Sequence, residues 1–379
     1  MPANSTREAS TAGIDAAPGS KSAFKQKKPV AASQNTIPLW EPNDFFRMID
    51  EVDVLDFSSL ADDAAPVTDV LFFSPGNPGI VNFYELFLED LQRRLSTKGV
   101  RVFGSSHLGH NLGIITESTR NYHIDLGDII SNKLSIIEAI LRECVPRWTT
   151  APTVAVSLLS HSMGCYVNLS VVTRLTALLE TLSADLGVTF KLSHNVLLHP
   201  AIMEVRAGCS GPLLWAENAL LRTLMSLAAR STLKVLPSET RLQLAVKALN
   251  STHESAAASK YNRHSIGVTA RMLMQPRSIS NILHLIHNEI DEINQLPSAQ
   301  LEAALAVCRH TFLYSAHDKW ATQTHRAGVD QVIAQTAGDQ AMTFGAEQAL
   351  GRDIPHQFCT DDDATSRLVR FVMDRLDLG

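Results

Sequence analysis

Residues 153–182 combine three features that few folds can hold together: an apolar strand, a serine in a tight turn, and a helix. Apolar and β-branched residues stop at Ser160-His-Ser-Met-Gly164, and a helix-compatible stretch follows from Cys165 to about Leu182. In such a nucleophile elbow, small residues must flank the serine, because larger side chains would collide with the strand or the helix. We therefore predict Ser162 as a nucleophile, with the helix N-terminus stabilising nearby negative charge. An ordinary turn is the alternative, since the five-residue pattern also occurs by chance.

Short apolar strands alternate with longer helical segments from Val70 onward. This alternation predicts a mostly parallel central sheet with helices on both faces, and ligands gather at the carboxyl edge of such a sheet. Together with the elbow, it predicts the α/β class and an α/β-hydrolase fold. The expected strands are Val70–Phe73, Val100–Phe103, Thr153–Leu159, Asn195–His199, Thr311–Tyr314 and Ala341–Phe344, and the expected helices include Tyr84–Leu95 and Asp128–Cys144.

Two stretches interrupt this pattern. Residues 1–38 are rich in Ser, Ala, Pro and Lys and nearly lack aromatics, so they cannot bury enough surface to offset chain entropy. We expect a disordered extension there, with a transit peptide as the alternative. Residues 203–305 look mainly helical, which predicts a lid inserted between two strands. The hydrolase core then comprises residues 39–202 and 306–379.

Composition excludes several classes of function. A formal charge of −6 and a pI near 6.2 argue against general nucleic-acid binding. No apolar run reaches the roughly 18 residues that a membrane-spanning helix needs. The cysteines lack C-x-x-C spacing, which predicts a reducing compartment and no structural zinc. They are Cys144, Cys165, Cys209, Cys308 and Cys359. We expect no cofactor, and no pattern identifies a protein partner.

A serine nucleophile needs a base and an acid, which follow it in this fold in the order Ser, acid, His. Asp318 follows the Thr311–Tyr314 strand and His356 follows the last strand, so both are expected beside Ser162. Three rivals are weaker. His310 precedes its strand, His325 is expected on a helix facing solvent, and Asp291 lies in the insertion.

The oxyanion hole requires two backbone N–H donors. Met163 supplies one, directly after the nucleophile. The loop Gly76-Asn-Pro-Gly79 follows the Val70–Phe73 strand, and Asn77 is its expected donor because Pro78 has no N–H. A simple Pro/Gly turn is the alternative. His107 and His110 are weak metal-ligand candidates, and we expect them at the rim of the pocket instead.

The segment Leu213–Leu236 is unusually apolar and carries Arg222, Arg230 and Lys234 against the single acid Glu217. A basic helix with an apolar face is typical of a membrane-surface element. An ordinary lid helix packed on the core is an equally good interpretation of this segment alone.

A series of short motifs follows in a fixed order along the chain: Phe73-Ser-Pro-Gly-Asn-Pro-Gly79, Phe83-Tyr84, Gly109-His110, Ser160-His-Ser-Met-Gly-Cys-Tyr166, Leu198-His-Pro-Ala-Ile202, Ser210-Gly-Pro212, Asp318-Lys-Trp320 and His356-Gln-Phe358. With these motifs, the chain resembles the lipid droplet-associated hydrolase family from about Val70 to its C-terminus. The resemblance is most specific at the Gly-Asn-Pro-Gly loop and its downstream Phe-Tyr, and Ser160 departs from the glycine usual at that position. It implies Ser162, Asp318 and His356 as nucleophile, acid and base, and a protein on the cytosolic side of lipid droplets or the endoplasmic reticulum.

These observations predict a serine esterase or lipase that cleaves hydrophobic lipid esters of the sterol ester or acylglycerol type. The same fold and triad serve thioesterases and peptidases, so those activities remain alternatives. The alternative from another class of function is a binding protein. It would act at lipid surfaces, retaining the hydrolase fold for binding with little catalysis.

Overall fold

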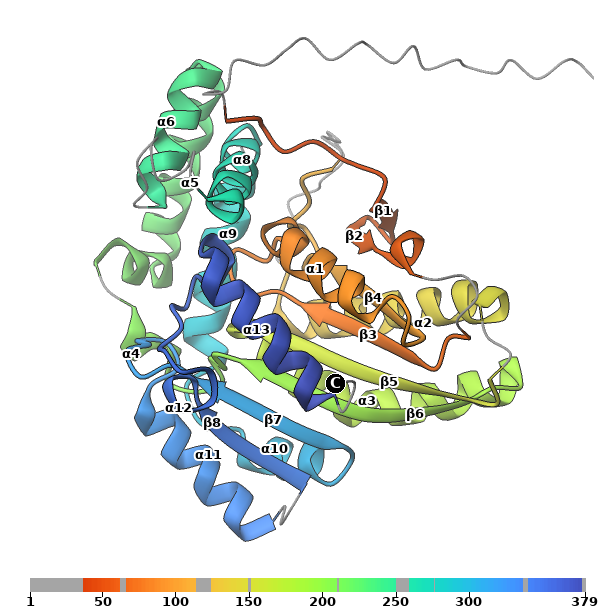
Figure 1. Ribbon diagram of the computed structural model, residues 1–379. Helices are drawn as coiled ribbons and strands as arrows, with labels where there is room; N and C mark the ends of the chain where they lie inside the picture. The colour runs from red at the N-terminus through yellow and green to blue at the C-terminus, as the bar shows by residue number, and fades with distance from the viewer. Residues whose placement is uncertain are drawn as a thin grey trace, which may run out of the picture. The chain divides into compact units, whose positions relative to one another are not determined.

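Eight strands form one sheet in the computed structural model, in the order β1-β2-β4-β3-β5-β6-β7-β8 (Figure 1). β1 pairs antiparallel with β2, β2 pairs antiparallel with β4, and all other neighbours are parallel. This topology, with a serine turn after β5, is an α/β-hydrolase fold, as predicted. The strands are β1 (Phe46–Ile49), β2 (Val52–Asp56), β3 (Asp69–Ser74), β4 (Val100–Ser105), β5 (Thr153–His161), β6 (Thr189–Leu198), β7 (Arg309–Tyr314) and β8 (Ala341–Gly345).

The described residues are 37–61, 66–113, 124–148, 151–209, 211–249, 259–275, 277–336 and 340–376. The prediction of disorder over residues 1–38 therefore falls almost entirely outside them. Within these ranges, no helix combines the length and the apolarity required to cross a bilayer.

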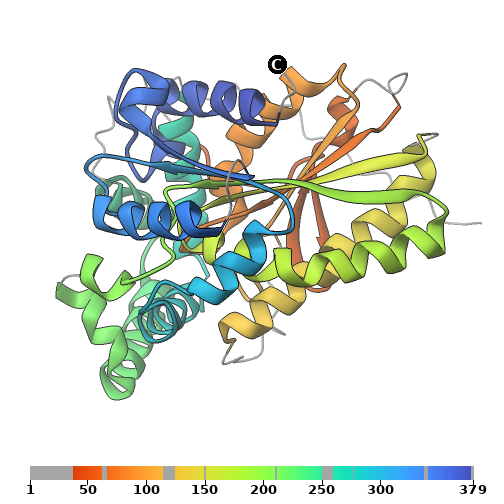
Figure 2. The ribbon, with the colours of Figure 1, turned by 90° about the horizontal axis from the view of Figure 1, so that it is seen from below.

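Helices cover both faces of the sheet and create two apolar cores (Figure 2). One face is covered by α1 (Glu85–Leu95) and α13 (Asp362–Arg375), whose buried residues cluster with Leu71 and Phe73 of β3. The other face is covered by α2 (Leu126–Trp148), α3 (Met163–Leu186), α10 (Ser298–Leu305) and α11 (Gln323–Thr336). Because both faces are buried, the central strands are apolar almost throughout, as expected of parallel sheets.

The hairpin of β1 and β2 is absent from the sequence-based prediction. β1 is only half-buried, so it shows little hydrophobic patterning. Its turn uses Asp50 and Glu51, both with positive φ (48° and 63°), instead of the Asn-Gly or Asp-Gly pairs that mark such turns in sequence.

The described chain between β6 and β7 is mainly helical. The helices before α10 lie beyond the carboxyl ends of β5 and β6 (Figures 1 and 2), whereas α10 covers one face of the sheet. The assignment of residues 203–305 as a separate lid stays a prediction. Before α10, the elements are α4 (Val205–Gly208), η3 (Gly211–Glu217), α5 (Ala219–Val235), α6 (Ser238–Ala248), α8 (Lys260–Leu273) and α9 (Ser278–Glu292).

Candidate active site

Ser162 occupies a strained turn between β5 and α3. Its backbone has φ 55° and ψ −126°, a conformation that L-residues rarely adopt outside functional sites. The turn is held because the Ser162 N–H donates to the Leu198 carbonyl (3.0 Å) and its own carbonyl accepts from Ala201 (3.2 Å). Gly164 is required for packing, since a Cβ there would lie 2.4 Å from the Pro75 carbonyl oxygen. Strand and helix therefore meet as the sequence predicts.

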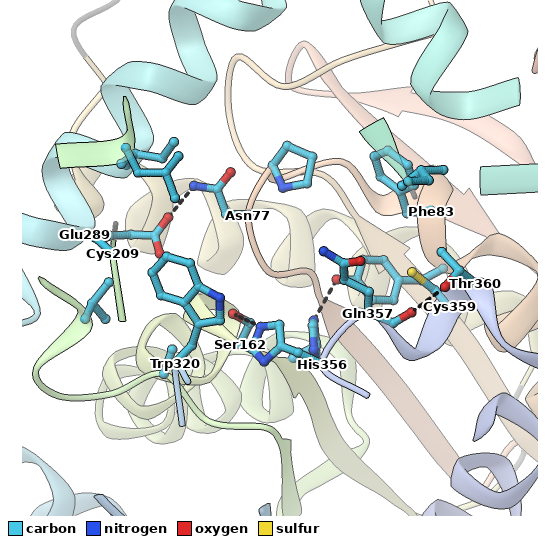
Figure 3. A pocket seen from close by; sticks show the side chains of 18 residues that line it. Asn77, Phe83, Ser162, Cys209, Glu289, Trp320, His356, Gln357, Cys359 and Thr360 are labelled. Carbon is cyan, nitrogen blue, oxygen red and sulfur yellow. Dashed lines mark hydrogen bonds between the residues drawn. The ribbon is translucent and has the colours of Figure 1, made fainter. Parts of the chain in front are cut away.

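The structure brings Ser162, His356 and Asp318 together from three loops at the carboxyl edge of the sheet. His356 Nε2 lies 2.9 Å from Ser162 Oγ (Figure 3), and His356 Nδ1 lies 2.6 Å from Asp318 Oδ2. The other carboxyl oxygen, Asp318 Oδ1, accepts from the backbone N–H groups of Trp320 (2.8 Å) and Ala321 (3.2 Å). Such a chain can move a proton from the serine to the imidazole while the carboxylate fixes the ring.

A second histidine, which was not predicted as a site residue, binds the same carboxylate. His199 directly follows β6, is fully buried, and places Nδ1 3.2 Å from Asp318 Oδ2. Burial alone would raise the pKa of Asp318, but the hydrogen bonds from His199 and His356 outweigh it and hold the pKa well below the ordinary value. Asp318 is therefore an ionised acceptor. The sequence signal was available, because His199 obeys the same strand-end rule that identified Asp318.

The rival residues lie elsewhere. His310 is buried at the N-terminal end of β7 and contacts the Cys308 carbonyl through Nδ1 (2.9 Å). Asp291 is exposed on α9. The expectation that His325 faces solvent was wrong: its side chain is buried on α11, with Nε2 3.5 Å from a carboxylate oxygen of Glu204. Glu204, at the start of the insertion, lies beside a position that the helix pattern marks as polar.

The loop after β3 packs directly against the elbow. A Cβ on Gly76 would lie 2.6 Å from Ser162 Cβ, so only glycine permits this approach. Tyr84, buried in η2 (Val81–Tyr84), joins the two segments: its hydroxyl accepts from the Gly76 N–H (3.4 Å) and lies 2.7 Å from His161 Nδ1. In the described part of the chain, neither the Asn77 nor the Met163 backbone N–H donates to another protein group. Both N–H groups are therefore left without a protein acceptor within the described residues.

A cavity of about 270 Å³ opens above Ser162 and is lined mainly by apolar side chains of the core and the insertion. Its most polar corner pairs Asn77 with Glu289 of α9, whose Oε1 accepts from Asn77 Nδ2 at 2.5 Å (Figure 3). Burial raises the pKa of Glu289 to about 7, and the hydrogen bond from Asn77 only partly opposes that effect.

Replacing Glu289 with leucine should therefore stabilise the fold at alkaline pH. The raised pKa means that the folded protein holds this proton more tightly than the unfolded chain, so wild-type stability falls as the pH rises from the ordinary value of 4.5 through about 7. Leucine has no proton to lose. The free energy of unfolding of Glu289→Leu, relative to wild type, should increase by about 3 kcal/mol between about pH 4 and pH 8. Chemical denaturation across this range measures it, and a difference independent of pH would contradict the assignment.

The expectation that His107 and His110 line the pocket rim was wrong. Both are buried beneath Gly79, where a Cβ would lie 2.9 Å from His110 Cγ and 3.1 Å from His107 Cδ2. They support the loop from below and do not contact the cavity. Among the described residues, the group of three potential metal ligands is instead His161, His199 and His356, which surround the nucleophile and the acid.

The chain is similar to several known proteins. The model of the family described as lipid-droplet associated hydrolase matches residues 68–359. The lipid droplet-associated hydrolase of Homo sapiens is 22% identical over 298 residues, which cover 77% of this chain and 80% of that protein. The one from Gallus gallus is 22% identical over 262 residues, covering 66% and 70%. Among solved structures, the chain is similar to the enol-lactonase from Burkholderia xenovorans LB400, with a TM-score of 0.49, 12% identity, and coverage of 88% of this chain and 99% of that one.

Proposed function

This chain belongs to the lipid droplet-associated hydrolase family, and from that premise we propose that it is a serine esterase that cleaves carboxylic esters of hydrophobic lipids. One observation carries the proposal: Ser162, His356 and Asp318 form a continuous hydrogen-bonded chain at the base of an apolar cavity. The fold, the order of the three residues along the chain and the family all agree with this assignment.

The reaction proceeds in two steps. His356 Nε2 takes the proton from Ser162 Oγ as that oxygen attacks the ester carbonyl carbon, and then gives the proton to the departing alcohol. Water next attacks the acyl-serine, and His356 again transfers a proton, now from water to the serine oxygen. The product acid and free Ser162 result. Asp318 orients the imidazole and stabilises its charged form in both steps.

The oxyanion formed in each step is assigned to the backbone N–H groups of Asn77 and Met163. Support comes from the approach of Gly76 to Ser162 and from the absence of competing protein acceptors, within the described residues, for these two donors. Met163 also begins α3, so the helix dipole adds to the stabilisation of negative charge.

The substrate assignment rests on the lining of the cavity and on the relatives' names. Apolar side chains such as Leu213, Ile286 and Trp320 surround the site, which favours an acyl chain over a charged group. Sterol esters and acylglycerols both satisfy this requirement. A thioesterase or peptidase would use the same three residues, so parallel assays of matched ester, thioester and amide substrates decide between them.

A protein that only binds lipid surfaces is the alternative from another class, and a fluorophosphonate probe tests it. The probe reacts covalently with an activated serine, so folded wild-type protein should be labelled at Ser162. Folded protein without any labelling would instead favour the binding module.

The helix α5 is the best candidate for contact with a lipid phase. Leu220, Leu224 and Leu227 lie on one face and are exposed by 67%, 52% and 54%, whereas Leu233 on the other side is buried. One of the three cations expected to assist contributes less, because Arg222 turns back and donates to the Ala216 carbonyl. The proposed location is the surface of lipid droplets or the cytosolic face of the endoplasmic reticulum.

The variants Leu220→Glu and Leu224→Glu should bind neutral-lipid emulsions at least tenfold more weakly than wild type. Burial of one leucine contributes roughly 1.5–3 kcal/mol, and a carboxylate removes that gain. Flotation of purified protein with emulsions measures binding, after thermal unfolding shows that each variant is folded. Met342→Glu is the matched control, since Met342 is 48% exposed on β8, outside this segment. If both leucine variants bound like the control, α5 would be an ordinary lid helix.

A further inference from the structure

Glu289 is the one carboxylic acid among the described residues that line the cavity, and no lysine or arginine accompanies it there. Its side chain is only 6% exposed in the whole protein. Oε1 accepts from Asn77, while Oε2 has no partner among the described residues. Burying a carboxyl group with one hydrogen bond is costly. An acid retained at this cost inside a pocket indicates a role in binding.

We propose that Glu289 and Asn77 form a polar subsite that binds a free hydroxyl group on the alcohol part of the substrate, so that partial acylglycerols are preferred over esters without hydroxyls. The inference rests on the proposed esterase function and specifies the substrate class of the same site. Sterol esters and fully esterified glycerol lack this hydroxyl.

The geometry suits such a group. Asn77 follows Gly76, which contacts the nucleophile, so a group bound at Asn77 lies close to the reacting ester. In a partial acylglycerol, two or three carbons separate a free hydroxyl oxygen from the ester oxygen. The bound hydroxyl donates to Glu289 Oε2, and its oxygen accepts the second N–H of Asn77 Nδ2, since the first is donated to Glu289. All three groups are then paired.

Other alcohol parts fit this corner less well. A hydrocarbon alcohol would exclude water and leave Oε2 buried and unpaired, and sites built for a hydroxyl reject substrates that lack one. A cation would exchange its hydration for a single acid, and burial already raises the pKa of that acid to about 7, which disfavours the charged form that a cation needs. One such acid does not offset the desolvation of an ammonium group.

The test compares three soluble esters of one short acyl chain: the glyceryl monoester, the propyl ester and the choline ester. Wild type should show a kcat/KM for the glyceryl ester about ten- to a hundredfold above that for the propyl ester. In Glu289→Leu this ratio should fall close to one. Asp291→Asn, which changes an exposed acid on the same helix, should keep the wild-type ratio. Thermal unfolding and labelling of Ser162 establish that each variant is folded and has a reactive serine.

Three outcomes would overturn the subsite. If Glu289→Leu lowered both rates equally, Glu289 would only hold the loop that carries Asn77. A wild type with no preference for the glyceryl ester would remove the basis of the inference. Preference for the choline ester, lost in Glu289→Leu, would make the corner a cation site. All three leave esterase activity standing. Failure of the proposed function looks different, because wild type would then neither hydrolyse any ester nor react with the serine probe.

Discussion

Replacing Ser162 with alanine should abolish covalent labelling by a fluorophosphonate probe and reduce ester hydrolysis by roughly 10⁴–10⁶-fold. The loss is this large because the variant has no nucleophile for His356 to activate, and only the oxyanion donors and substrate binding remain. Burst-phase and steady-state assays with a chromogenic ester measure the change. The substitution removes one oxygen atom from a residue that is 7% exposed, so thermal stability should change little.

The partner residues provide the control for this prediction. His356→Ala should lose almost as much rate as Ser162→Ala, and the double variant should lose no more than the worse single variant, since the residues act as one unit. His325→Ala should retain far more activity, because its imidazole contacts Glu204 and Thr322, away from Ser162. Near-full turnover by His356→Ala together with a collapse in His325→Ala would show that the base has been misassigned.

Replacing Asn77 with proline should lower kcat by about 10²–10³-fold, the usual cost of losing one oxyanion donor. Proline has no backbone N–H, so this change removes the proposed donor while the Met163 donor remains. KM should change less than kcat, because the oxyanion exists only in the transition state. Single-turnover measurements of acylation separate these effects.

Asn77→Ala is the matched control for the proline variant. It retains the backbone N–H and removes the same side-chain amide, so its rate on a simple ester should exceed that of Asn77→Pro by at least tenfold. Thermal unfolding must first show that both variants fold. A folded proline variant that turns over as fast as the alanine variant would place the second donor at another residue.

Most of the fold could be predicted from the sequence, because its central strands are buried on both faces. Such strands appear as uninterrupted apolar runs, and β3, β4, β5 and β7 were confirmed close to their expected bounds. Pattern reasoning failed where burial is partial. β1 has only four residues, all half-buried, and the left-handed turn at Asp50 and Glu51 lacks the Asn-Gly or Asp-Gly pair that marks such hairpins in a sequence.

Some residues of the candidate site could likewise be predicted from the sequence, and others could not. Ser162, Asp318 and His356 each follow a strand, so chain order and the carboxyl-edge rule were sufficient to bring them together. The position of Glu289 in the site could not be predicted from the sequence. It lies on an amphipathic helix, and contacts with residues distant in sequence fix the orientation of that helix over the pocket. The prediction that His325 faces solvent was wrong for a related reason, because a segment distant in sequence, at Glu204, packs beside it. Long-range contacts that bury polar residues have no local signature.

The hydrogen bond between His199 and Asp318 joins the carboxyl ends of two neighbouring parallel strands, β6 and β7. His199 directly follows β6, Asp318 follows β7, and the helical insertion lies between these two strands along the chain. The two sheet strands thus hold His199 and Asp318 in place, and the insertion bears neither the nucleophile, the base nor the acid. Mutations within it can reshape what enters the pocket while the reacting atoms keep their spacing, so natural variation and directed evolution can retune substrate choice without rebuilding the chemistry.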